Sequence, residues 1–181
     1  MQALLDSVDL GHEAFASADD FLDQVESQRP GCLVLDIRMP GLGGLELQDK
    51  LIDRGDSVPI IFITGHGDVP MAVEALQKGA VDFIQKPFRD QDLLDRIRDA
   101  LSTDRERRER QHQQDEIDKR IARLTKREGE VFELVVTGKP NKVIAYELGV
   151  SQRTVEIHRA RVMEKMQARS LADLVKMHLG S

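Results

Sequence analysis

The sequence is poor in aromatic residues and nearly devoid of cysteine. Its 181 residues contain no tryptophan, and aromatic residues make up only 4% of the chain. A packed core must therefore consist of Leu, Ile, Val and Ala with a few Phe and Met. Cys32 is the single cysteine, which excludes an intrachain disulfide and a cysteine-based zinc site and is typical of the reducing cytoplasm.

Long hydrophobic runs are also missing. No apolar stretch approaches the ~20 residues that a membrane-spanning helix needs. The first residues after Met1 lack both the basic region and the apolar stretch of a signal peptide. We therefore expect a cytoplasmic protein with no membrane partner.

Positive charge is scarce overall but unevenly distributed. The net charge of the whole chain is −6. Residues 1–101 contain 9 Lys and Arg against 19 Asp and Glu, whereas residues 102–181 contain 17 against 13. An acidic half followed by a basic half indicates two domains with different partners.

The first half alternates apolar runs with amphipathic stretches. Short runs rich in β-branched residues predict strands, and periodic apolar residues between them predict helices. The expected strands are 32–36, 58–64 and 81–84, and the expected helices are 45–53, 69–78 and 90–101. This alternation predicts a doubly wound parallel sheet with helices on both faces.

The second half is helical by pattern. Residues 102–117 are highly charged with few apolar positions, which predicts a helical linker rather than a coiled coil, since no apolar heptad is sustained. A capping box at Thr125–Glu128 begins the next helix, and further helices are expected at 141–148, 151–166 and 171–179. Two short helices joined by a glycine-containing turn indicate a helix-turn-helix within residues 118–181.

Three polar side chains fall where the expected strands end. Asp36 ends the first strand, Thr64 ends the second and Lys86 follows the third. The carboxyl ends of parallel strands lie at one edge of a sheet, so these side chains are expected to converge. A nucleophilic carboxylate beside a hydroxyl and an ammonium group suits phosphoryl transfer.

Residues 1–101 resemble the receiver domain of two-component response regulators, most closely the FixJ-like branch. The stretches that carry the resemblance are Leu33–Gly44, Ile63–Asp68 and Gly79–Phe88. The resemblance implies a flavodoxin-like fold, a sensor histidine kinase as phosphate donor and Asp36 as phosphoacceptor. It also implies phosphate-binding and switch roles for four residues: Thr64, Gly65, Phe83 and Lys86.

The resemblance further implies a Mg²⁺ ion, and here the chain departs from the family. Receiver domains hold Mg²⁺ with an acidic pair that follows their first strand, with the acceptor aspartate and with a backbone carbonyl. By resemblance, the acceptor here is Asp36 and the carbonyl is that of Arg38. No such strand or pair precedes the helical pattern that begins at Gln2. Asp19 and Asp20 read as the start of a helix instead. We therefore expect a receiver truncated at its N-terminus, with a doubtful Mg²⁺ site.

Residues 118–181 resemble the LuxR-type helix-turn-helix domain. The carrying stretches are 124–128, 138–145, 148–151, 154–158 and 165–166. On the helix 151–166, an exposed isoleucine on a polar face suits contact with thymine methyl groups. The candidate DNA-binding residues are Lys142, Arg153, Thr154, Glu156, Ile157, His158, Arg159, Ala160 and Arg161.

The sequence thus predicts a transcriptional response regulator of the FixJ/NarL type. Its expected partners are double-stranded DNA, a sensor histidine kinase, RNA polymerase and a second copy of the chain on DNA. An alternative is a phosphorylation-independent protein that binds DNA, dimerises or titrates a partner. A phosphatase of the haloacid-dehalogenase type is disfavoured, because Arg38 stands where its acid would be and does not donate a proton near neutral pH.

Overall fold

The computed structural model describes residues 1–27, 29–65 and 69–180. The chain divides into two compact units, Met1–Arg108 and Glu109–Ser181. The division falls inside the stretch that the sequence predicts as a helical linker. Within the described ranges, no helix has the length and apolarity needed to cross a bilayer.

The first unit contains a parallel sheet, as the sequence predicts. Its strands are β1 (Leu33–Asp36), β2 (Ile60–Thr64) and β3 (Asp82–Gln85), in the order β1-β2-β3. The register pairs Leu35 with Phe62 and Phe62 with Phe83. All five residues of β2 are buried, because β2 is the central strand and helices cover both faces of the sheet.

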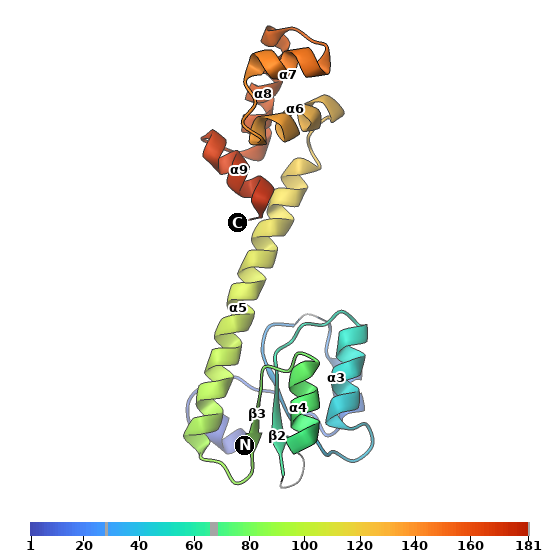
Figure 1. Ribbon diagram of the computed structural model, residues 1–181. Helices are drawn as coiled ribbons and strands as arrows, with labels where there is room; N and C mark the ends of the chain where they lie inside the picture. The colour runs from blue at the N-terminus through green and yellow to red at the C-terminus, as the bar shows by residue number, and fades with distance from the viewer. Residues whose placement is uncertain (28, 66–68, 181) are drawn as a thin grey trace. The chain divides into compact units, whose positions relative to one another are not determined.

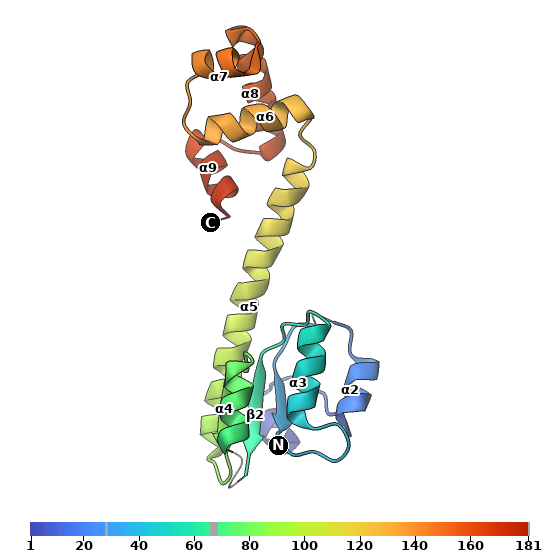
Figure 2. The same cartoon turned by 45° about the vertical axis from the view of Figure 1, so that its right-hand side comes forward.

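Helices cover both faces of this sheet. Figures 1 and 2 show α3 (Gly44–Asp53) and α4 (Val69–Gln77) on one side, with α2 (Ala18–Gln24) beside α3. The first turns of α5 (Asp90–Ile121) lie on the opposite side. Because side chains alternate along a strand, Phe62 packs with α2, α3 and α4, whereas Ile61 and Ile63 pack with α5.

The N-terminal residues form helices rather than a strand. Residues 2–6 form the short helix α1 (Gln2–Asp6), as the pattern from Gln2 predicts. The Ser17 hydroxyl caps α2 by accepting a hydrogen bond from the amide of Asp20 at 3.1 Å. Asp19 and Asp20 occupy the first turn of α2, which confirms that this pair begins a helix.

Strand β1 lies at an edge of the described sheet. Among the described residues, β1 pairs only with β2. A cavity of about 770 Å³ adjoins this region and is lined by residues of the N-terminal segment together with Leu33, Leu35 and Asp36.

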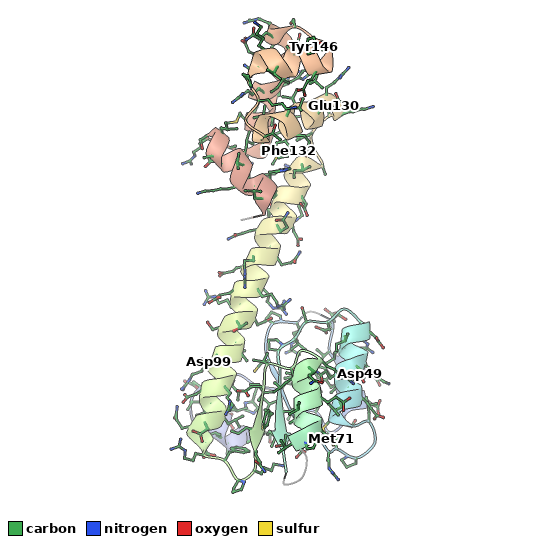
Figure 3. The ribbon with its side chains drawn as sticks, viewed as in Figure 1. Asp49, Met71, Asp99, Glu130, Phe132 and Tyr146 are labelled. Atoms are coloured by element: carbon green, nitrogen blue, oxygen red, sulfur yellow. The ribbon has the colours of Figure 1, made fainter. Side chains whose placement is uncertain are left out.

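The second unit is helical. It contains α6 (Lys126–Val136), α7 (Asn141–Leu148), α8 (Gln152–Met166) and α9 (Leu171–Leu179). Thr125 and Glu128 form the predicted capping box, and Gly149 ends α7 in the left-handed conformation with φ of 66°. The core contains Phe132 (labelled in Figure 3) and other apolar residues: Val131, Val135, Ile144, Val155, Val162, Met166 and Leu174.

The last turns of α5 contribute to this second core. The sequence predicts a helix at 90–101 and a separate helical linker, whereas the structure has one helix of 32 residues. Ile117 packs against the core of the second unit, and Arg120 donates a hydrogen bond to the carbonyl of Met166 at 3.3 Å. The C-terminal unit therefore includes residues before α6.

Candidate functional site

Asp36 and Lys86 meet at the carboxyl end of the sheet, as the position of Asp36 at the end of β1 and of Lys86 directly after β3 predicts. The Nζ atom of Lys86 lies 2.6 Å from Oδ2 of Asp36. The other carboxylate oxygen, Oδ1, accepts a hydrogen bond from the amide of Arg38 at 3.1 Å. Both side chains stay accessible, at 34% exposure for Asp36 and 53% for Lys86, so an incoming group can reach them.

Thr64 and Lys86 are joined through the backbone. The amide of Lys86 donates to the carbonyl of Thr64 at 2.8 Å, and the Lys86–Pro87 peptide bond is cis. The Thr64 side chain is fully buried, and its Oγ1 has no hydrogen-bond partner among the described residues. Unlike Asp36 and Lys86, Thr64 is therefore not open to solvent.

The remaining predicted switch residues flank this edge. Gly65 follows Thr64 and is half-buried. Phe83 lies on β3 and packs, half-buried, against the core that includes Phe62. The stretch Ile63–Asp68 is described only to Gly65, because residues 66–68 lie outside the described ranges.

A cavity of about 650 Å³ opens beside Asp36 and Lys86. Its polar lining includes Ser7 and Asp90, and its apolar lining includes Leu4 among others. The residues of α1 thus adjoin the predicted phosphoacceptor.

The residues at this edge do not fit a Mg²⁺ site. Mg²⁺ requires oxygen ligands in a near-octahedral arrangement. Among the described residues, no group of three or more His, Cys, Asp or Glu side chains is placed to hold a metal ion. The ammonium of Lys86 also lies against one oxygen of Asp36. Among the described residues, Asp36 and the Arg38 carbonyl, which the receiver resemblance implies as ligands, thus lack the acidic pair that would complete the site.

Helix α8 presents one apolar and one exposed polar face. Val155, Val162 and Met166 are fully buried, which confirms the predicted inward face. The opposite face is exposed and carries Arg153, Glu156, Ile157, Ala160, Arg161 and Glu164. Ile157 is 45% exposed on this face although it is one of the large apolar residues of the chain.

The other predicted DNA-binding residues lie around this face with different environments. Lys142 is exposed near the start of α7, and Thr154 is half-buried in the first turn of α8. His158 is half-buried, with an Nδ1 atom that has no hydrogen-bond partner among the described residues. Arg159 donates from Nη1 to Oδ1 of Asn141 at 3.1 Å, which ties α8 to the first residue of α7.

Comparison with known proteins decides the family. Residues 1–98 match the family model described as response regulator receiver domain. Residues 122–178 match the model described as bacterial regulatory proteins, luxR family. The chain is a response regulator. Both resemblances stated from the sequence are thereby confirmed, as is the flavodoxin-like fold with a helical DNA-binding domain.

Curated relatives match nearly all of this response regulator and somewhat less of their own length. The chain is 50% identical over 174 residues to Nodulation protein W of Bradyrhizobium diazoefficiens, covering 96% of this chain and 77% of that protein. It is 48% identical over 176 residues to the transcriptional regulatory protein FixJ of Azorhizobium caulinodans, covering 97% and 83%. The chain is thus a FixJ/NarL-type transcriptional regulator, a class whose partners are DNA and a sensor kinase.

A solved structure supports the assignment of the fold. Response regulator StyR matches this response regulator with a TM-score of 0.89 and 44% identity, over 99% of this chain and 91% of that one. Full-length FixJ from B. japonicum matches with a TM-score of 0.58 and 42% identity. These similarities extend over both domains.

Two polar residues of this response regulator were missed by reasoning from the sequence. Asn141 holds Arg159, and Asp104 is 2% exposed although it lies in the charged stretch. The only signal in the sequence for the burial of Asp104 was its helical spacing from Leu93, Ile97 and Ala100. These residues form an apolar stripe, and a charged residue seldom continues such a stripe. No sequence pattern indicated the contact of Asn141.

Proposed function

We propose that this response regulator binds double-stranded DNA through the exposed face of α8 and that Asp36 is its phosphoacceptor. The single observation that carries the DNA-binding half is the exposure of Ile157 between charged residues on a helix anchored by a buried face. A major groove that presents thymine methyl groups provides apolar contact for such a side chain.

The polar residues beside Ile157 supply hydrogen bonds to the bases and phosphates of DNA. Arg153 and Arg161 carry guanidinium groups that pair with guanine edges or phosphates, and Glu156 accepts from the amino group of cytosine. Ala160 leaves space for a base edge beside Ile157. Specific contacts of this kind discriminate by about 1–3 kcal/mol for each base pair.

Four further residues are assigned to the DNA backbone. Lys142, Thr154, His158 and Arg159 lie around the exposed face of α8. The contact of Arg159 with Asn141 uses one nitrogen of a guanidinium that has five N–H donors, so donors remain for a phosphate. These contacts position α8 in the groove without reading sequence.

The phosphoryl half of the proposal rests on the 2.6 Å contact between Asp36 and Lys86. The donor is a phosphohistidine on a sensor kinase. A carboxylate oxygen of Asp36 attacks phosphorus, an O–P bond forms as the P–N bond breaks, and the released imidazole nitrogen keeps the electron pair and takes a proton from water. The Lys86 ammonium neutralises charge on the phosphoryl oxygens.

Control of transcription follows from the two sites. Two copies of the chain bind neighbouring half-sites on one duplex, which raises the affinity for an operator. The bound pair then acts on RNA polymerase in the bacterial cytoplasm, where the DNA is. Phosphorylation of Asp36 favours this bound state.

A second function is favoured by one specific observation: among the described residues, Asp36 is not part of any group of three or more side chains placed to hold a metal ion. This second function is DNA binding that does not depend on phosphorylation. The discriminating experiment measures DNA binding before and after incubation with Mg²⁺ and a small acyl phosphate. Control by phosphorylation predicts tighter binding for the natural chain and no change for Asp36→Asn. Equal binding in all samples supports the second function.

A further inference from the structure

The core-facing stripe of α5 ends in a carboxylate. Leu93, Ile97 and Ala100 are buried, and Asp104 continues the same helical face one turn later. Asp104 is 2% exposed and is the last buried residue of α5. An apolar side chain is the ordinary occupant of such a position, because a buried charge needs several partners.

Three donors surround the Asp104 carboxylate. Its Oδ1 accepts from Nη2 of Arg107 at 2.6 Å. Its Oδ2 accepts from Nε of Arg108 at 2.7 Å and from the backbone amide of Gly31 at 3.2 Å. Gly31 lies before β1 and is 73 positions from Asp104. One carboxylate therefore joins two turns of α5 to a loop of the receiver.

The two arginines extend this connection to a second loop. Arg108 donates from Nη2 to the backbone carbonyl of Arg29 at 2.6 Å, in the segment before β1. Arg107 donates from Nη1 to the hydroxyl of Ser57, in the segment before β2. Both segments lie at the amino ends of their strands, whereas Asp36 lies at the carboxyl end of β1.

The electrostatics agree with an ionised Asp104. Burial raises the pKa of this carboxyl, but the hydrogen bonds from Arg107, Arg108 and Gly31 outweigh it and lower the pKa below its ordinary value. Beyond Asp104, no described residue of α5 is buried up to Ile121. The first compact unit also ends at Arg108, the last residue of this cluster.

We propose that Asp104 is the anchor by which the receiver holds the linker helix, fixing residues 104–108 of α5 against the loops that precede β1 and β2. The anchor goes beyond DNA binding and phosphorylation, because it determines where the receiver ends along a continuous helix. The rival explanation is that the apolar stripe from Leu93 to Ala100 holds the helix alone and that the polar cluster adds nothing.

Amide hydrogen exchange on the full chain tests the anchor. Asp104→Asn keeps the shape of the side chain and removes its charge. Asp99→Asn is the matched control, because Asp99 lies on the same helix and is exposed (Figure 3). We expect the amides of residues 105–108 and of Gly31 to exchange at least ~10-fold faster in Asp104→Asn, since charge-assisted hydrogen bonds are lost. Exchange in Asp99→Asn should equal that of the natural chain.

Two results with Asp104→Asn overturn the proposal. Unchanged exchange at 105–108 in Asp104→Asn shows that apolar contacts suffice. An equal acceleration throughout β1 and β2 shows that Asp104 stabilises the whole domain rather than the linker. If Asp104→Asn does not fold, Arg108→Gln carries the test, because it leaves Arg107 and Gly31 on the carboxylate. That variant should accelerate exchange only near 105–108, and no acceleration there refutes the anchor.

Discussion

Nζ of Lys86 lies 2.6 Å from Oδ2 of Asp36, although the two residues are 50 positions apart in the chain. The Lys86 ammonium thus places one positive charge beside Asp36, the predicted nucleophile. A Mg²⁺ ion bound beside Asp36 would add two more positive charges to stabilise the phosphoryl group. The described residues form no group of three or more side chains placed to hold that ion, so we expect much of the transition-state charge to remain uncompensated.

We therefore predict that this 181-residue chain accepts phosphate slowly. With Mg²⁺ and a small acyl phosphate, labelling should be on the order of a hundred-fold slower than in a receiver that has the complete acidic pair, because several kcal/mol of charge stabilisation are lost. The measurement is the rate at which acid-labile phosphate appears. Asp36→Asn gives the background, and rapid Mg²⁺-dependent labelling of Asp36 would contradict the prediction.

A second prediction concerns the exposed face of α8. Ile157→Asp places a negative charge beside base edges and phosphates, so operator binding should weaken by about 10–100-fold. Gel-shift titration measures the change. Ile121→Asp is the control, because Ile121 is also exposed, at 36%, and lies outside α8. Unchanged operator affinity in Ile157→Asp would remove α8 from the proposed interface.

The sequence predicted the strand ends and helix caps well because these depend on local chemistry. Asp36, Thr64 and Lys86 are marked by the ends of apolar runs, and the Thr125 capping box needs only residues three positions apart. The buried face and the exposed face of α8 were predicted from the helical periodicity of its apolar residues. In each case the signal lies within a few residues of the feature.

Features that depend on distant partners were not predictable. Asp104 reads as part of a solvated charged stretch until Gly31 and the two arginines surround it. Ile117 reads as a linker residue until it packs with the second core. Their environments are set by tertiary contacts, which a local pattern does not contain.

Lys142 allows a different kind of test, because it is predicted to contact phosphate and not bases. Lys142→Ala should weaken binding to all sequences alike and lower the slope of log affinity against log salt by ~0.9, the value for one lost phosphate contact. Binding is measured over a salt series with an operator and with unrelated DNA. A loss confined to the operator would show that Lys142 reads bases instead.

The packing of Ile117 leads to a prediction on fragments. Fragment 118–181 should fold, because its caps and apolar periodicity agree throughout. Fragment 109–181 should be more stable by about 1 kcal/mol, since it retains the partly buried Ile117. Urea denaturation followed by circular dichroism compares the two, with Ile117→Ala in the longer fragment as control.

The same fragments address dimerisation. A monomeric fragment 118–181 should bind an operator weakly, whereas two copies joined by a flexible linker should bind more tightly because the second half-site is met at raised effective concentration. Equal affinity for the single and the linked fragment would show that one copy suffices.

The last prediction concerns the buried Glu128, whose Oε2 accepts from Nζ of Lys165 at 2.5 Å and from the amide of Thr125 at 2.8 Å. These hydrogen bonds, with that from Lys165 the strongest cause, lower the pKa of Glu128 from about 4.5 to about 2 against the effect of burial. A lowered pKa means that the folded state favours the ionised carboxylate. Its stabilisation is therefore present above pH 4.5 and is lost as the pH falls from 4.5 towards 2.

Glu128→Gln should accordingly lower the free energy of unfolding of fragment 109–181 by about 2 kcal/mol at pH 7, because hydrogen bonds to a charged group are removed. The difference from the natural fragment should shrink as the pH is lowered from 4.5 to 2, since Glu128 then becomes protonated. Glu130→Gln is the matched control on the same helix (Figure 3): Glu130 makes a surface ion pair with Arg127 at 2.7 Å, which contributes about 0.5 kcal/mol. A stability difference for Glu128→Gln that does not change with pH would show that the side chain acts through shape and not through its charge.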